Sequence, residues 1–312
     1  MSVIRLLMCA SPSVLRGMGV LGVALGLGCS PQPPEPTLQY RTVPRDTGQQ
    51  VVRFAVHPLH NPYKLSQAYQ PLMDHLNGHI EGVRFELEAS RDYPAFEQKI
   101  STRQAHFVLP NPWQTLQAIP KGYRVIAMAG NPDDFKGLFI VRRDSGIHKP
   151  QDLRGKIVSY PSPTALAAAV MPQDFLVQSG LDIHRDIQNV YVGSQESSIM
   201  NVFLGTATAG ATWPPPWRAF QRDHPTEAAA LMPIWETAPL INNSVMARDD
   251  VPPALQQQVL RLLLDLTNSE SGRNILARME TARFLASDNQ AYDVVRSYVE
   301  RFERKVRKVQ EP

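Results

Sequence analysis

The sequence predicts an α/β fold made of two doubly wound lobes that are joined by two crossings of the chain. Three observations favour this fold. Apolar strand-like segments alternate with amphipathic helix-like segments from residue 51 onward, the pattern starts afresh after Asp144, and 312 residues are long enough for two domains. Such an alternation is typical of mostly parallel sheets with helices on both faces.

The first unit begins with the strand VVRFAV and a helix that carries an apolar stripe on one face. In the second helix Asp92 is a suitable N-cap, and Pro94 falls in the first turn, where proline is best tolerated. The unit is expected to contain strands at 51–56, 83–89, 106–110, 123–129 and 137–143 and helices at 64–76 and 92–100.

The second unit begins with DLRGKIVSY, and its first helix ends at the C-cap residue Gly180. Later strands and helices are expected at 189–193, 195–205, 207–213 and 216–220, then at 231–237 and 243–248, followed by two or three long helices. We assign residues 51–140 plus 236–312 to lobe one and 141–235 to lobe two. The two crossings are expected near 136–143 and 231–240.

The N-terminal residues are typical of an exported lipoprotein. Arg5 and Arg16 precede an apolar run that is too short to span a bilayer, so residues 1–28 are interpreted as a signal peptide. The segment LGLGCS resembles a lipobox, with Gly26 where leucine is usual, and predicts a lipid on Cys29. Residues 29–50 are proline-rich and are interpreted as an extended tether. The expected location is the periplasm, with the protein anchored to the membrane by its lipid.

Cysteine content and net charge limit which disulfides and which partners the protein can have. Cys9 would leave with the signal peptide, so the mature chain would keep only Cys29 and form no internal disulfide. Removal of residues 1–28, which carry two arginines and no acid, lowers the formal net charge from +3 to +1. This charge does not favour a nucleic-acid partner.

Three predicted helix starts follow strands and carry hydroxyl groups, at 92–93, 160–164 and 193–196. In open α/β sheets, ligands bind at such places, where backbone N–H groups and a helix dipole face the ligand. No acid lies between Tyr160 and Pro172, so Ser162 and Thr164 favour an oxyanion. The alternative is that these hydroxyls only cap helices. Tyr69 lies on an apolar stripe and is equally compatible with a place in the core.

Several segments, in order, resemble the phosphate, phosphite and phosphonate-binding proteins of bacterial ABC importers. The resemblance runs from Val51 to the final helices and is most specific in RRDSGIHKPQDLRGKIVSYPSPTA. The other segments are NPYKLSQAYQPLMDHL, RDYPAFEQKI, LPNPWQTLQAIPKGY, YVGSQESSIMNVFLGTATAGA and NNSVMARDDVP. The resemblance implies a two-lobed, type II periplasmic binding fold that closes on its ligand.

The resemblance also implies a set of ligand-binding residues between the lobes. Lobe one would contribute Tyr69 and Tyr93, and lobe two would contribute Ser162, Thr164, Ser194, Gln195 and Glu196. Pro163 and Ala165 stand where the family has serines, and Thr208 falls where aminoalkyl-phosphonate binders have an aspartate. We therefore expect a small phosphorus oxyanion or simple phosphonate.

The same resemblance implies a monomeric solute-binding protein that delivers its ligand to an ABC permease and ATPase, with no cofactor, no metal and no enzymatic activity. An alternative with the same fold is a lipoprotein that presents its ligand to a membrane sensor kinase. A metal-binding importer subunit is suggested by His57-x-x-His60 and His75-x-x-x-His79, but His79 would lie roughly 20 Å along the helix. A hydrolase is disfavoured because no G-x-S-x-G or H-E-x-x-H motif occurs.

Overall fold

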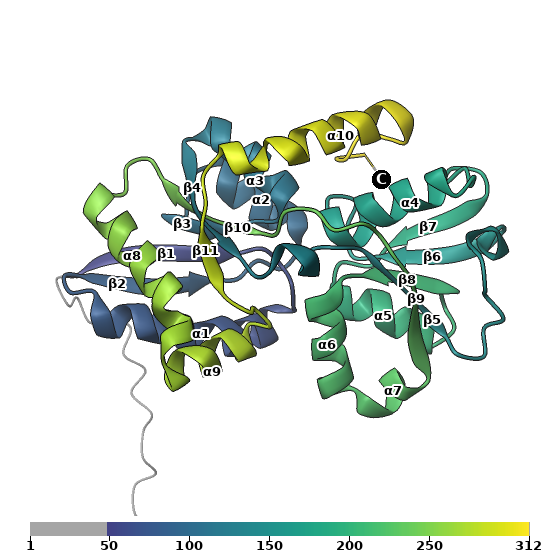
Figure 1. Cartoon of the computed structure of the whole chain (residues 1–312), viewed down its shortest axis with the longest axis horizontal. Coiled ribbons are helices and arrows are strands. Elements are labelled where there is room, and N and C mark those ends of the chain that lie inside the picture. The colour runs from purple at the N-terminus through teal and green to yellow at the C-terminus, as the bar shows by residue number, and fades with distance from the viewer. Residues whose placement is uncertain (1–48, 312) are drawn as a thin grey trace, which may run out of the picture. The chain divides into compact units, whose positions relative to one another are not determined.

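Two β-sheets form the framework of residues 49–311, the part of the chain that this computed structural model describes (Figure 1). The six-stranded sheet has the order β11-β4-β10-β3-β1-β2, and the five-stranded sheet has the order β7-β6-β8-β5-β9. The strands are β1 (Gln50–Val56), β2 (Val83–Glu88), β3 (Phe107–Leu109), β4 (Tyr123–Ala129), β5 (Leu138–Arg142), β6 (Lys156–Tyr160), β7 (Ile187–Tyr191), β8 (Ala209–Thr212), β9 (Leu231–Glu236), β10 (Ser244–Arg248) and β11 (Phe284–Ala286).

Helices pack against both sheets. The α-helices are α1 (Pro62–His79), α2 (Tyr93–Ser101), α3 (Pro112–Ala118), α4 (Met171–Gln178), α5 (Gln195–Phe203), α6 (Pro214–Asp223), α7 (Pro225–Ala229), α8 (Pro253–Asp265), α9 (Glu270–Arg278) and α10 (Asp293–Lys305). Short helical turns are η1 (Ile119–Lys121), η2 (Pro132–Asp134), η3 (Pro150–Leu153), η4 (Leu166–Val170), η5 (Leu266–Asn268) and η6 (Gln290–Tyr292). The predicted alternation of strands and helices is confirmed.

Strand pairing is mixed, which corrects the expectation of mostly parallel sheets. β1 runs parallel to β2 and β3, and β6 runs parallel to β7 and β8. In contrast, β10 and β11 pair antiparallel in the first sheet and β5 does so in the second. β5 and β10 are the strands that the chain forms directly after crossing between the sheets, and each enters its new sheet in the opposite direction.

The chain crosses between the sheets twice, after β4 and after β9. We call the part that contains the first sheet lobe one and the part that contains the second sheet lobe two. β5 begins at Leu138, ahead of the boundary expected at residue 140, because its pairing with β8 and β9 already starts there. β9 ends at Glu236, next to the second expected boundary.

The predicted apolar stripe of the first helix forms the core side of α1. Its buried residues are Leu65, Ala68, Tyr69, Leu72, Met73 and Leu76. In α2 the predicted cap is present, since the carboxylate of Asp92 accepts a hydrogen bond from the Ala95 N–H at 2.8 Å. Local sequence therefore determines the start of α2.

The helix predicted after Thr164 begins differently. It starts with a π-helical turn, Leu166–Val170, that continues directly into α4, and its N-cap Ala165 makes no side-chain hydrogen bond. Every residue of that turn is buried. The hydroxyls of Ser162 and Thr164 are thus not N-caps of this helix.

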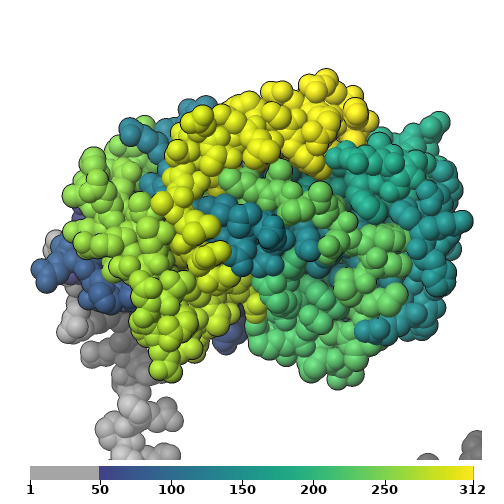
Figure 2. Space-filling model, in the orientation of Figure 1, coloured from purple at the N-terminus to yellow at the C-terminus, as the bar shows by residue number. Residues whose placement is uncertain are grey.

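The C-terminal helix α10 joins the two lobes (Figures 1 and 2). It packs on α3 of lobe one, and the residues around its end contact lobe two. Tyr298 Oη donates to Asp174 at 3.0 Å, and Arg307 donates to Gln173 Oε1 at 2.7 Å and to the Pro163 carbonyl at 2.9 Å. We call this segment, residues 293–311, the C-terminal strap.

The expectations for residues 1–28, for the lipid on Cys29 and for nearly all of the tether at 29–50 lie outside the described residues. Within residues 49–311, none of the helices combines the length and the hydropathy that a membrane crossing requires.

Candidate functional site

A small cavity lies between the lobes, where strands of both sheets end. Its volume is about 10 Å³, room for about one water molecule. It is lined by His57, Tyr93, Asn111, Phe135, Ala165, Leu166, Ala167, Ala168, Gln195, Trp213 and Asn243. Most of these residues follow the carboxyl ends of β1, β2, β3, β6, β7 and β8. Ligands of open α/β sheets bind at this edge, so we call this space the cleft cavity and treat it as the candidate site.

Tyr93 and Gln195 meet across the cleft cavity. The Gln195 amide donates to Tyr93 Oη at 3.2 Å, and its oxygen accepts from Thr212 Oγ1 at 3.0 Å. Both side chains are buried, with 2% exposure each. Burial raises the pKa of Tyr93, so its phenol stays protonated. Among the described residues none accepts that hydroxyl hydrogen, which leaves it available to an anion.

Ser162 and Thr164 lie beside the cleft cavity and face a carboxylate of lobe one. Thr164 Oγ1 donates to Glu97 Oε1 at 2.7 Å and lies 3.2 Å from Ser162 Oγ. Gln114 Nε2 donates to the same Glu97 oxygen at 3.1 Å. Burial raises the pKa of Glu97, while the hydrogen bonds from Thr164 and Gln114 act in the opposite direction. Thr164, one of the two residues whose hydroxyls are expected to hold an oxyanion, thus bridges the lobes in this structure.

The segment of lobe two that follows Thr164 also lines the cleft cavity. Residues 165–168, at the start of the π-helical turn, line the cleft cavity directly. The Thr164 carbonyl accepts from Asn111 Nδ2 at 3.0 Å, and Asn111 Oδ1 caps α3 through the Gln114 N–H. One asparagine therefore fixes the start of α3 and ties it to the loop that precedes the helix of lobe two.

Tyr69 borders a separate, neighbouring cavity. It is 1% exposed and lines a space of about 20 Å³ that shares Trp213 and Asn243 with the cleft cavity. Tyr69 thus lies near Tyr93 but does not line the same cavity.

Ser194 and Glu196, also predicted at the site, occupy other positions. Ser194 is the N-cap of α5, with its hydroxyl accepting from the Ser197 N–H at 3.1 Å. Glu196 accepts from Lys64 Nζ at 2.8 Å and lies 3.0 Å from His224 Nε2. Burial alone would raise the pKa of Glu196, but Lys64 and His224 outweigh it and hold the pKa below its ordinary value. Glu196 is an ion-paired carboxylate outside the cleft cavity.

Four side chains of the cleft cavity that carry polar atoms were not predicted from sequence: His57, Asn111, Trp213 and Asn243. Asn111 had a signal, because an Asn-Pro pair after a strand is a helix start. Asn243 had no such signal, because the sequence pattern concerns only residues that follow the end of a strand. It precedes β10, which runs antiparallel to β3 and β4, so the amino end of β10 lies at their carboxyl ends.

Asn243 and His57 add uncharged polar groups to the cavity. Asn243 is 3% exposed, and its Oδ1 is buried without a partner in the described structure. An unpaired buried polar atom destabilises a fold by about 1–3 kcal/mol, which marks Asn243 as a group for a ligand or water. His57 Nδ1 lies 2.9 Å from the Leu109 carbonyl, and burial lowers the His57 pKa to about 4 despite that bond. The imidazole is therefore neutral at ordinary pH.

The four histidines with metal-like spacing do not form one site. His57 is buried beside Tyr93 and Phe96, whereas the rings of His75 and His79 lie 4.3 Å apart on α1. In residues 49–311 no group of three or more His, Cys, Asp or Glu side chains is arranged to hold a metal ion.

The sequence matches a known family over most of its length. The matching profile is described as ABC transporter, phosphonate, periplasmic substrate-binding protein, and it covers residues 54–292. This range includes every predicted ligand-binding residue.

Solved structures of similar proteins show the same fold. A binding protein component of an ABC phosphonate transporter from Pseudomonas aeruginosa has a TM-score of 0.76 at 14% identity, over 82% of this chain and 88% of that one. PhnD1 from Prochlorococcus marinus, in complex with methylphosphonate, has a TM-score of 0.74 at 20% identity, over 82% and 98%. XAC2383 from Xanthomonas citri, bound to chloride, has a TM-score of 0.65 at 20% identity, over 82% and 99%. The fold is the two-lobed type II periplasmic binding fold.

Proposed function

We infer the function from the family: the chain belongs to the periplasmic substrate-binding proteins of phosphonate ABC transporters, which bind substrates for transport and are not enzymes. We propose that this protein captures a small phosphorus oxyanion, namely phosphate, phosphite or a simple phosphonate, in the cleft cavity. It would deliver the ligand to the permease and ATPase of an ABC importer while a lipid on Cys29 anchors it to the membrane.

The observation that carries the ligand class is the chemistry of the cleft cavity. Its polar lining consists of uncharged groups, the side chains of Tyr93, Asn111, Gln195 and Asn243 and neutral His57, together with the backbone at the start of a helix. An oxyanion is stabilised by several N–H and O–H donors and by the positive end of a helix dipole. A cavity of this kind supplies such donors without a competing carboxylate in its lining.

Opening of the lobes is part of the proposal, because a cavity of about 10 Å³ is too small for a phosphonate. The bond from Thr164 to Glu97 joins the two lobes and would break on opening. We propose that the hydroxyls of Ser162 and Thr164 then turn to the ligand, with Tyr69 next to them and Ser194 supporting Gln195 and Glu196 from the N-terminus of α5.

An aminoalkyl phosphonate is disfavoured because its ammonium group needs a free carboxylate. The carboxylates that border the neighbouring small cavities are paired already: Glu196 with Lys64 at 2.8 Å, Asp223 with Arg222 at 3.2 Å, and Asp134 and Glu280 each with Arg218 at 3.3 Å. Thr208, expected at the amine site, instead precedes β8, at the strand end away from Trp213. The argument against an amine therefore rests on the paired carboxylates.

Calorimetry on the purified protein with phosphate, phosphite, methylphosphonate and 2-aminoethylphosphonate tests the ligand class. We expect one of the first three to bind more tightly than the amine-bearing ligand. Loss of one hydroxyl in Tyr93→Phe should weaken binding about tenfold, since a hydrogen bond to a charged group contributes about 1.5–3 kcal/mol. Tyr63→Phe is the matched control, because Tyr63 is 72% exposed.

Two further comparisons sharpen that test. Thr164→Ala should weaken binding more than Glu196→Gln, because the Glu196 carboxylate is held by Lys64 and His224. Preference for 2-aminoethylphosphonate, or a larger loss from Glu196→Gln, would contradict the proposed ligand class.

Anchoring is tested separately by cell fractionation. Cys29→Ala should release the mature chain from membranes or stop processing of the signal peptide. A variant that remains as membrane-bound and as fully processed as the parent would rule out the lipid on Cys29.

A further inference from the structure

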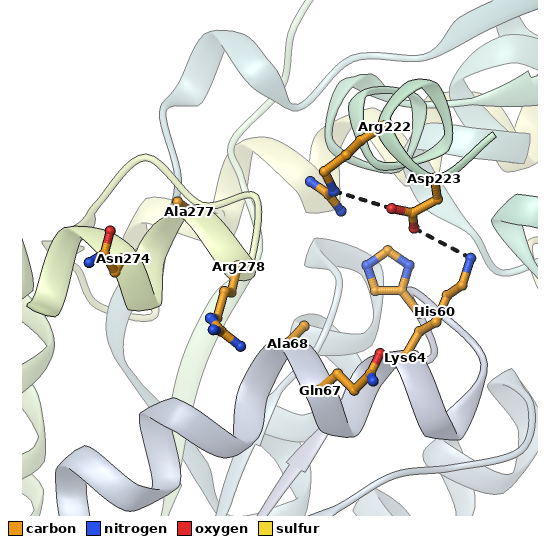
Figure 3. A pocket seen from close by; sticks show the side chains of 9 residues that line it. All are labelled: His60, Lys64, Gln67, Ala68, Arg222, Asp223, Asn274, Ala277 and Arg278. Atoms are coloured by element: carbon orange, nitrogen blue, oxygen red, sulfur yellow. Dashed lines mark hydrogen bonds and ion pairs between the residues drawn. The ribbon is translucent and has the colours of Figure 1, made fainter. Parts of the chain in front are cut away.

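A second and far larger cavity lies outside the cleft cavity, between α1 and α9 of lobe one and α6 of lobe two (Figure 3). Its volume is about 720 Å³, within the range of about 300–1,000 Å³ that is usual for small-molecule sites. It is lined by His60, Lys64, Gln67, Ala68, Arg222, Asp223, Asn274, Ala277 and Arg278. We call it the basic cavity.

Three cationic side chains line the basic cavity, and Asp223 is the acid among the lining residues. Lys64 Nζ lies 3.4 Å from Asp223 Oδ2 and Arg222 Nε lies 3.2 Å from Asp223 Oδ1. Arg222 also pairs with Glu280, and Lys64 pairs with Glu196 at 2.8 Å. Asp223 thus partly neutralises one side of the cavity.

Arg278 differs from Lys64 and Arg222, because among the described residues it has no salt-bridge partner. It extends from α9 into the same space as Lys64 and Arg222, and no dashed line reaches it in Figure 3. Within residues 49–311, no carboxylate lies in salt-bridge distance of its guanidinium. A guanidinium offers a planar pair of N–H donors that fits a carboxylate or phosphoryl group in two-point contact.

The remaining lining groups are compatible with an anion. Gln67 and Asn274 are exposed amides that can donate N–H bonds. Burial lowers the pKa of His60, and the charge of Lys64 lowers it further, so the imidazole is neutral and still carries one N–H donor. A small neighbouring space is lined by the same His60, Lys64 and Asp223 together with Gln195.

We propose that the basic cavity binds a small molecule with two acidic groups, one held by Arg278 of lobe one and the other by Arg222 of lobe two and Lys64. A ligand with one charge would gain a full ionic partner at Arg278 alone, because Asp223, Glu196 and Glu280 already pair with the other two cations. A second acidic group would bind Arg222 and Lys64 in competition with these carboxylates and so join the lobes. This proposal does not rest on the proposed function of the cleft cavity.

The test is calorimetry on the purified protein with pyrophosphate and with phosphonoacetate, each of which carries two acidic groups. Arg278→Gln should weaken binding of both about tenfold or more, because a charge-assisted two-point contact is lost. Arg261→Gln is the matched control: Arg261 is an exposed arginine of α8 that does not line the basic cavity, and its loss should leave binding unchanged.

A cross-comparison separates this proposal from the proposed function. Methylphosphonate should bind Arg278→Gln as it binds the parent, whereas Tyr93→Phe should retain binding of pyrophosphate. The basic-cavity site is refuted if neither diacid binds the parent, if Arg278→Gln binds both as tightly as the parent, or if Arg261→Gln loses as much affinity. None of these results bears on methylphosphonate in the cleft cavity.

Discussion

Glu97 places a half-buried carboxylate beside the hydroxyls of Ser162 and Thr164 and bonds directly to Thr164 across the lobes. Its pKa is raised above the ordinary value of 4.5, with burial as the main cause. A carboxyl group whose pKa is raised in the folded state stabilises the fold fully below its unfolded pKa and loses this contribution as pH rises through the folded pKa. Glu97 therefore weakens the fold when it ionises.

The first prediction concerns Glu97→Gln. The amide keeps the oxygen that accepts from Thr164 and Gln114 but carries no charge, so it should unfold at about the same temperature as the parent near pH 4 and at a higher temperature near pH 8. Thermal unfolding across this range, with Glu86→Gln as the control for a more exposed acid in lobe one, measures the difference. Equal unfolding temperatures at both pH values would contradict the sign of the pKa shift.

At the residue scale, the sequence predicted Tyr93 and Gln195 and missed Asn111 and Asn243. The first two follow strand ends and could be found from helix starts and resemblance. The function of Asn111 depends on the carbonyl of Thr164, and that of Asn243 depends on an antiparallel strand. Both depend on contacts between segments that are distant along the chain, which spacing does not reveal.

Arg307 makes the C-terminal strap part of the architecture of the site. It is 7% exposed, and its guanidinium donates to Gln173 and to the carbonyls of Pro163, Lys308, Val309 and Glu311. Pro163 lies between Ser162 and Thr164. The strap therefore holds the backbone of this loop through the Pro163 carbonyl.

The second prediction is that Arg307→Gln loosens this loop. Loss of several charge-assisted bonds should lower the free energy of unfolding by about 2–4 kcal/mol and weaken methylphosphonate binding, because the loop is no longer held in place. Denaturant unfolding and calorimetry are the measurements. The control is Arg304→Gln, which removes an exposed arginine from α10. Unchanged affinity in a folded Arg307→Gln protein would show that the strap supports stability alone.

At the element scale, periodicity and capping predicted α1, α2 and most strands, because these signals are local. The π-helical turn and the strap were not predicted. The alanine-rich segment at 165–169 carries no signal that distinguishes a π-turn from an α-turn, and the helix at 293–305 reads only as an amphipathic surface helix. Its bridging function arises from Tyr298 within the helix and from Arg307 beyond its end.

At the scale of the whole molecule, lobe two touches lobe one through polar contacts as well as through the chain crossings. Lys64 pairs with Glu196, Thr164 bonds to Glu97, and Arg218 lies 3.3 Å from both Asp134 and Glu280. Partly exposed ion pairs such as Lys64–Glu196 and Arg218–Asp134 contribute about 0–1 kcal/mol each, so these pairs oppose opening of the lobes only weakly.

The third prediction follows from the weakness of these ion pairs between the lobes. Without ligand, the purified protein should sample an open state, and saturation with methylphosphonate should reduce its radius of gyration. A compact unit of this size has a radius of gyration of about 18 Å, and hinge closure should change it by a few per cent. Small-angle scattering with and without ligand is the measurement. An unchanged value at saturation, with binding verified by calorimetry, would count against a hinge.

The two lobes and both crossings could be predicted from the sequence, since the alternation restarts after Asp144. The direction of β5 and β10 could not. The residues of a strand do not indicate which strands will be its neighbours in the sheet. The direction of β5 and β10 depends on the path of the chain between the sheets.

Trp213 gives the molecule a built-in optical signal. It is 5% exposed, its ring lies 5.4 Å from that of Phe135, and it lines both the cleft cavity and the cavity beside Tyr69. Of the four tryptophans, Trp113, Trp217 and Trp235 line neither of these spaces. Indole fluorescence shifts to longer wavelengths when water reaches the ring. The emission maximum of Trp213 should therefore move to longer wavelengths each time the lobes open. Capture and release can thus be timed in a stopped-flow instrument on the unlabelled protein.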